Sequence, residues 1–123
     1  MINLRRAYEP AVRDGSRVVL VDRLWPRGVR KTTLKLDAWL KDVAPSTELR
    51  QWFNHDPDKW TEFRRRYRKE LEDNPVALTP LLVAAAAGDV TLLYSAHDVA
   101  HNQAVVLKEL LEEMMADRGA AGR

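Results

Sequence analysis

The stretch "RVVLVD", residues 17 to 22, is the feature that most constrains the fold of this chain. Residues 18–21 are consecutive apolar side chains, mostly valine, so the segment has no polar face. Such runs are typical of strands that are buried on both faces, as in parallel sheets. A second run, "VTLLY" at 90–94, has the same character, and residues 2–6 alternate as a shorter strand would. The sequence therefore predicts a small, mainly parallel sheet.

Three helices are predicted between the second strand and the last one. Ser46 can cap a helix that ends near Asn54. Asp56 is followed by a proline, and this pair indicates the start of an amphipathic helix over 57–73. A third helix is predicted over 76–87. Long helical crossovers of this kind normally join parallel strands.

The remaining elements complete a prediction of one α/β domain. Residues 34–43 fit both a strand and a helical stripe, and we favour a strand or extended segment. After the last strand, Asp98 is predicted to cap a final helix. We expect a single compact three-layer domain over residues 1–116, with a small sheet flanked by helices, and a flexible tail at 117–123.

Length and composition limit the possible classes of protein. A chain of 123 residues suits one domain, and 46% apolar with 31% charged residues is normal for a globular protein. The formal net charge of +2 does not by itself indicate nucleic-acid binding. Cysteine is absent, which excludes disulfides and thiolate metal sites and suits the cytosol. No signal peptide and no bilayer-spanning apolar run is found, so we expect a cytoplasmic protein without membrane contact.

Two loops of the predicted sheet carry candidate binding residues. Ligands of open parallel sheets bind at the carboxyl ends of the strands. If the strands 17–20 and 90–94 are neighbours, the polar groups of both loops converge on one crevice, and arginine forks there could hold an anion. No phosphate-cradling glycine motif accompanies them. The candidate ligand-binding residues are Asp22, Arg23, Arg27, Ser95 and Asp98.

His101 and Asn102 are the candidate catalytic residues of the second loop. Imidazole is suited to acid or base chemistry near neutral pH, and Asn102 or Asp98 could orient it. A metal site built from His97, Asp98 and His101 is an alternative, but it would need a further ligand. We expect no metal and no cofactor, and a small anionic molecule as ligand.

Two other functions compete with ligand binding. The basic stretch "RRRYRKE", residues 64–70, could contact nucleic-acid phosphates. Carboxylates one turn away can pair with these bases, however, so a solvated helix face is the preferred interpretation. An interaction role is the other alternative, in which Trp25 would be an interface anchor. The sequence does not specify an oligomeric state.

Three long phrases of the chain resemble the YeaO-like family of small bacterial proteins, whose domain has no known function. They are "VDRLWPRG", "WLKDVAPSTELRQWFNHDPDKWTEFRRRYRKEL" and "LLYSAHDVAHNQAVVLKELL", and the resemblance extends over about residues 2–113. It implies a compact α/β domain in a bacterial cytosolic protein, and no established reaction. More distant relatives carry cysteines after the last strand, so any thiol chemistry of theirs is absent here. The family's recurring polar positions correspond to Asp22, Arg23, Arg27, Ser46, His55, Asp56, Tyr94, Ser95, Asp98, His101 and Asn102.

Overall fold

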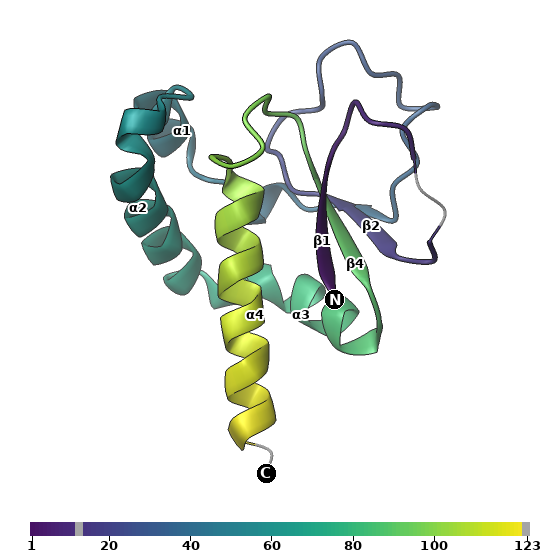
Figure 1. Cartoon of the computed structure of the whole chain (residues 1–123), viewed down its shortest axis with the longest axis vertical. Helices are drawn as coiled ribbons and strands as arrows, with labels where there is room; N and C mark the ends of the chain where they lie inside the picture. Colours follow the sequence, from purple (N-terminus) through teal and green to yellow (C-terminus); the bar gives the residue numbers. More distant parts are fainter. Residues whose placement is uncertain (12–13, 122–123) are drawn as a thin grey trace.

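The computed structural model describes residues 1–11 and 14–121, with side chains described up to Asp117. Its core is a four-stranded sheet in the order β1-β4-β2-β3, in which all neighbours are parallel. The strands are β1 (Ile2–Arg6), β2 (Arg17–Leu20), β3 (Ala38–Trp39) and β4 (Val90–Tyr94). The predicted parallel sheet is confirmed, and β4 lies between β1 and β2 (Figure 1).

The helices follow the predicted order. They are the short 3-10 turns η1 (Lys41–Val43) and η2 (Pro57–Lys59), and the helices α1 (Thr47–Phe53), α2 (Trp60–Glu72), α3 (Pro75–Ala87) and α4 (Gln103–Ala121). Two predicted caps are confirmed. The Ser46 hydroxyl accepts the Leu49 amide at 3.1 Å, and the Asp56 carboxylate accepts the Asp58 amide at 3.0 Å.

The helices form one layer against the sheet. Helices α2, α3 and α4 contact one another, and Figure 1 shows them gathered away from the loops that follow β1 and β2. Their apolar stripes, including Phe63 and Leu107, pack with Val19 and Leu92 in one buried cluster. Leu20 is also fully buried, although it lies outside that cluster. The compact α/β domain is confirmed, and loops form much of its second flank.

Three local expectations differ from the structure. In the segment 34–43, only Ala38–Trp39 is a strand, because its short pairing with β2 ends where η1 begins. The prediction that Asp98 caps the last helix is wrong, because α4 starts at Gln103. Helix α4 also continues through 117–121, where a tail was expected; the flexibility of that end stays a prediction, and residues 122–123 lie outside the described residues.

None of the described helices combines the length and apolar character that a membrane crossing requires.

Candidate ligand-binding pocket

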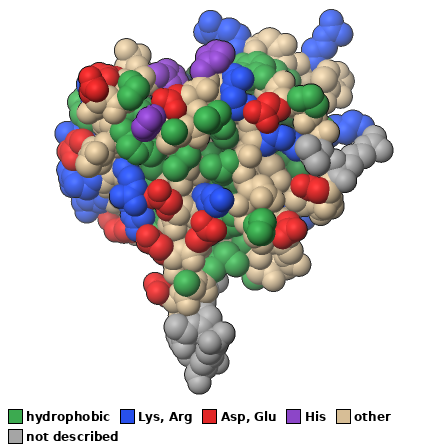
Figure 2. Space-filling model, in the orientation of Figure 1, with side chains coloured by type: hydrophobic (Ala, Val, Ile, Leu, Met, Phe, Trp, Pro, Cys, Tyr) green, Lys and Arg blue, Asp and Glu red, His purple; other side chains and the backbone are tan. Residues whose placement is uncertain are grey.

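A pocket opens at the carboxyl ends of the central strands. Because parallel strands point the same way, the segments that follow β1, β2 and β4 meet at one edge of the sheet. They enclose a cavity of about 990 Å³. Figure 2 shows the three histidines of the chain at this end of the molecule. The candidate binding, catalytic and metal-ligating residues of the two loops all line the cavity: Asp22, Arg23, Arg27, Ser95, His97, Asp98, His101 and Asn102.

Asp22 ties the segments around the pocket together. Its side chain is 8% exposed and accepts the Ser95 amide at 3.0 Å and the Ser95 hydroxyl at 2.5 Å. Its other carboxylate oxygen accepts the side-chain amide of Gln103, the first residue of α4. Burial raises the Asp22 pKa, and the hydrogen bonds from Ser95 and Gln103 offset part of that rise. Asp22 therefore links the ends of β2 and β4 to the start of α4.

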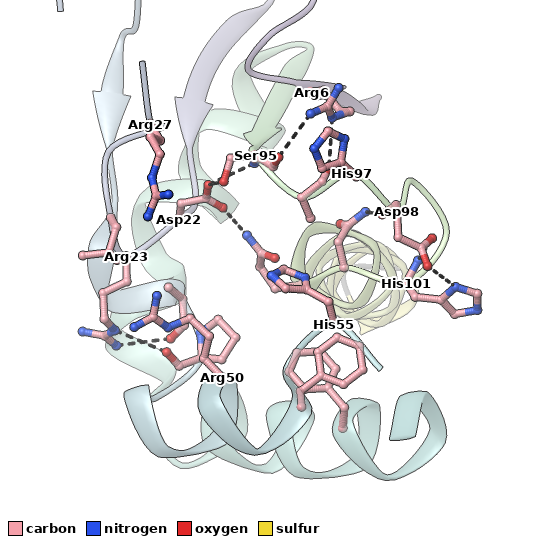
Figure 3. A pocket seen from close by; sticks show the side chains of 18 of the residues that line it. Arg6, Asp22, Arg23, Arg27, Arg50, His55, Ser95, His97, Asp98 and His101 are labelled. Atoms are coloured by element: carbon pink, nitrogen blue, oxygen red, sulfur yellow. Dashed lines mark hydrogen bonds and ion pairs between the residues drawn. The ribbon is translucent and has the colours of Figure 1, made fainter. Parts of the chain in front are cut away.

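Two of the arginines around the pocket support its walls (Figure 3). Arg23 donates to the carbonyls of Pro45 at 3.3 Å and Ala44 at 3.4 Å, which joins the loop after β2 to the entrance of α1. Arg6 donates to the carbonyl of Ala96 at 2.9 Å and so joins the end of β1 to the loop after β4. Carbonyl oxygens accept these bonds without neutralising the positive charge.

Arg27 lies in a loop whose backbone is fixed. Val29 donates to the Pro26 carbonyl at 3.2 Å, and Gly28 has φ of 79°, a conformation that favours glycine in such a turn. The Arg27 carbonyl accepts the Tyr8 hydroxyl at 2.9 Å. Trp25 anchors the same turn by donating its indole N–H to the Val29 carbonyl at 2.6 Å. The guanidinium thus projects from a well-supported backbone.

Arg27 and Arg50 are the pocket arginines with no internal partner. Within residues 1–11 and 14–117, no hydrogen bond or ion pair engages either guanidinium. Arg50 comes from α1 and is close enough for its positive charge to lower the Asp22 pKa slightly. Both side chains line the cavity and are exposed. The pocket therefore presents two positive charges that the described part of the protein leaves available.

The turn before α4 uses most of its polar groups internally. The Asp98 carboxylate accepts the amides of Ala100 at 2.9 Å and His101 at 3.0 Å. It also pairs with Nδ1 of His101 at 2.8 Å, and this contact lowers the Asp98 pKa. Asn102 caps α4 instead of Asp98: its side-chain oxygen accepts the Val105 amide at 3.2 Å, and its side-chain nitrogen donates to the Asp98 carbonyl at 2.9 Å. Buried Asn102 is thus fully engaged in shaping the turn.

Metal binding finds no support in this geometry. Among the residues that the structure describes, no three or more His, Asp or Glu side chains gather as they would around a metal ion. His97, Asp98 and His101 are close in sequence but do not form such a group.

The basic face of α2 differs from the pocket because its charges are paired. Figure 2 shows basic and acidic side chains interleaved over α2 and α4. The pairs are Arg64 with Glu109, Arg65 and Arg66 with Glu62, Arg68 with Glu113, and Lys69 with Asp73. This is the solvated, internally neutralised helix face that the sequence favoured.

The lining residues that were not predicted as site residues include Arg6, Arg50 and His55. Arg6 is the last residue of β1, which pairs with β4, but the local sequence does not reveal the strand order. Arg50 lies in the middle of α1, where no nearby motif marks it. His55 follows that helix, and only its place in the family's recurring phrases singled it out.

Comparisons with known proteins identify the family. The profile described as the "Inactive DUF488-N3 subclade" matches residues 1–123. The chain belongs to this family. The chain is also similar to the uncharacterized protein Rv3073c of Mycobacterium tuberculosis (strain ATCC 25618 / H37Rv), with 42% identity over 110 residues, which cover 89% of this chain and 92% of the relative.

A second relative confirms the YeaO-like resemblance. The uncharacterized protein YeaO of Escherichia coli (strain K12) is 41% identical over 113 residues, which cover 92% of this chain and 98% of YeaO. No solved structure matches the chain significantly.

Proposed function

We propose that this protein binds a small anionic molecule in the pocket at the carboxyl ends of β2 and β4. The observation that carries the proposal is the pair Arg27 and Arg50, which line the pocket and meet no acceptor among the described residues. A guanidinium binds carboxylate and phosphate oxygens through two parallel hydrogen bonds, which neutral ligands cannot match. The cavity of about 990 Å³ is large enough for a small metabolite.

The other pocket residues support this function indirectly. Arg6 and Arg23 use hydrogen bonds to carbonyls to hold the walls and add positive charge to the site. The hydrogen bond between Ser95 and Asp22 holds the ends of β2 and β4 together beside the pocket. The word "inactive" in the family's description favours binding without turnover.

Thermal unfolding with inorganic phosphate, sulfate and small dicarboxylates tests the proposal. A ligand that binds the folded state raises the unfolding temperature, by an amount worth about 2.7 kcal/mol at a hundred times its dissociation constant. We expect Arg27→Ala and Arg50→Ala each to lower the apparent affinity for the anion at least about tenfold, since a hydrogen bond to a charged group contributes roughly 1.5 to 3 kcal/mol.

Arg65→Ala is the matched control, because Arg65 is an exposed arginine that pairs with Glu62, and neither residue lines the cavity. It should respond to anions as the unaltered protein does. Equal loss of the response in Arg65→Ala would indicate a general charge effect and contradict the pocket proposal. An unaltered protein that no anion stabilises would contradict it as well.

One observation favours a catalytic alternative, acid or base chemistry by His101. Its hydrogen bond to Asp98 is the arrangement that orients an imidazole in many enzymes. If the pocket ligand is also turned over, His101→Ala should retain its binding and lose the turnover. A ligand that stays chemically unchanged on long incubation with the protein would rule this alternative out. No comparable observation favours nucleic-acid binding by α2, whose bases are paired.

A further inference from the structure

We propose that the His55 imidazole contacts the bound anion directly, and that its strained backbone is retained for this purpose. The inference rests on the anion-binding function proposed above. Its starting point is a conformational anomaly between α1 and η2. Asn54 has φ of 47° and His55 has φ of 55°, and they are the only non-glycine residues with positive φ in the described part of the chain.

Asn54 has a structural reason for this conformation. It is the C-terminal cap of α1, in the left-handed region, and its amide donates to the Arg50 carbonyl at 3.0 Å. Helices commonly end on such a residue, and asparagine is among the side chains that tolerate it. The fold alone thus accounts for Asn54.

His55 has no such reason. It follows the cap, and the next residue, Asp56, already donates to the Phe53 carbonyl at 3.0 Å and caps η2. Glycine would adopt the His55 conformation without a steric penalty. No other side chain or carbonyl among the described residues forms a hydrogen bond with the imidazole. A strained residue that packing does not explain is a candidate for function.

The position of His55 suits contact with a ligand. The residue lines the pocket and is exposed, and Figure 3 shows its side chain directed toward the middle of the pocket, whereas the His101 ring lies at the edge beside Asp98. His55 lies directly after the cap of α1, the helix that carries Arg50, and both residues line the cavity. An imidazole N–H donates to phosphate or carboxylate oxygens, as a guanidinium does.

The chain offers a matched pair of variants to test this inference, His55→Gly and Asn54→Gly. Both place glycine at a positive φ, and only the first removes a pocket side chain. We expect neither variant to unfold at a lower temperature than the unaltered protein. In titrations followed by thermal unfolding, Asn54→Gly should keep the response to inorganic phosphate, and His55→Gly should weaken the apparent affinity at least about tenfold.

The outcomes separate this inference from the proposed function. If phosphate stabilises the unaltered protein and His55→Gly equally, the His55 inference fails and anion binding stands. If His55→Gly unfolds well below the unaltered protein while Asn54→Gly does not, His55 is a structural residue and the inference also fails. If phosphate, sulfate and the small dicarboxylates all leave the unfolding temperature of the unaltered protein unchanged, the proposed function fails, and the His55 inference fails with it.

Discussion

The arginines of the pocket and the arginines of α2 differ in what their charges meet. On α2, Arg65 and Arg66 share the carboxylate of Glu62 at 2.6 and 2.9 Å, so each guanidinium already has an internal acceptor. In the pocket, Arg23 meets carbonyls, and Arg50 meets no acceptor in the described residues. The densest cluster of bases in the sequence is therefore the less available one. Pairing, rather than the number of arginines, distinguishes a binding surface from a solvated one.

The carboxylates of the two regions provide the largest predicted difference. Asp22→Ala removes the acceptor for the Ser95 amide, the Ser95 hydroxyl and Gln103, and leaves these donors unsatisfied in a largely buried place. We expect the free energy of unfolding to fall by about 3 kcal/mol. Glu62→Ala breaks exposed ion pairs only, and its urea midpoint should change far less.

Urea unfolding of both variants measures this contrast. Equal destabilisation by the two substitutions would mean that the network around Asp22 is no more important to the fold than a surface pair. The pocket and the surface of α2 would then not differ in how much their carboxylates stabilise the fold.

A second, smaller difference is predicted within the pocket itself. Arg23→Ala removes two long hydrogen bonds to Pro45 and Ala44, at 3.3 and 3.4 Å, and should lower the free energy of unfolding by about 1 kcal/mol. Arg50→Ala removes no hydrogen bond or ion pair of the described residues. Its free energy of unfolding should stay within about 0.5 kcal/mol of that of the unaltered protein. Denaturant midpoints in the absence of anions give both values.

The reverse order would contradict our division of the pocket arginines. If Arg50→Ala is the more destabilising variant, Arg50 has a structural role and the site loses one of its two available charges. The proposed anion site would then depend on Arg27 alone.

The sequence predicts the elements of this fold better than their arrangement. Consecutive apolar residues in β2 and β4 and the stripe that includes Phe63 and Tyr67 depend on burial, which local patterns record well. The caps at Ser46 and Asp56 were also correct, because a cap involves only neighbouring residues. The order β1-β4-β2-β3 depends on contacts between distant segments and was not predictable from the local pattern.

The candidate site shows the same division between local and distant information. Arg27 and Ser95 were identified because both follow buried runs and so had to lie at strand ends. Arg50 lines the pocket because the entrance of α1 is joined to the loop after β2 through Arg23, a contact that no local pattern indicates. The Asp98 cap was misplaced because Asn102, four residues later, is an equally good capping residue. The anion ligand and the cytoplasmic location stay predictions.

The smallest predicted effect concerns pH and separates the two regions by its sign. Exposed Glu62 hydrogen-bonds with Arg65 and Arg66, which lower its pKa to about 2. A lowered folded-state pKa contributes stability above the unfolded value, and this contribution is lost as pH falls toward about 2. Burial raises the pKa of Asp22, so its contribution has the opposite sign: it is present at low pH and is lost as pH rises above the usual aspartate range.

Glu62→Gln isolates the α2 half of this difference. The variant should lose slightly less stability than the unaltered protein between pH of about 5 and about 2, and high salt should shrink the gap because Glu62 is exposed to solvent. Urea midpoints at the two pH values, with and without added salt, measure it. If this difference between the two proteins is large and persists in high salt, the interactions of Glu62 are not those of an ordinary exposed ion pair. The arginines of α2 would then belong to a network as important as that of Asp22, and the contrast between paired surface and available pocket would have to be redrawn.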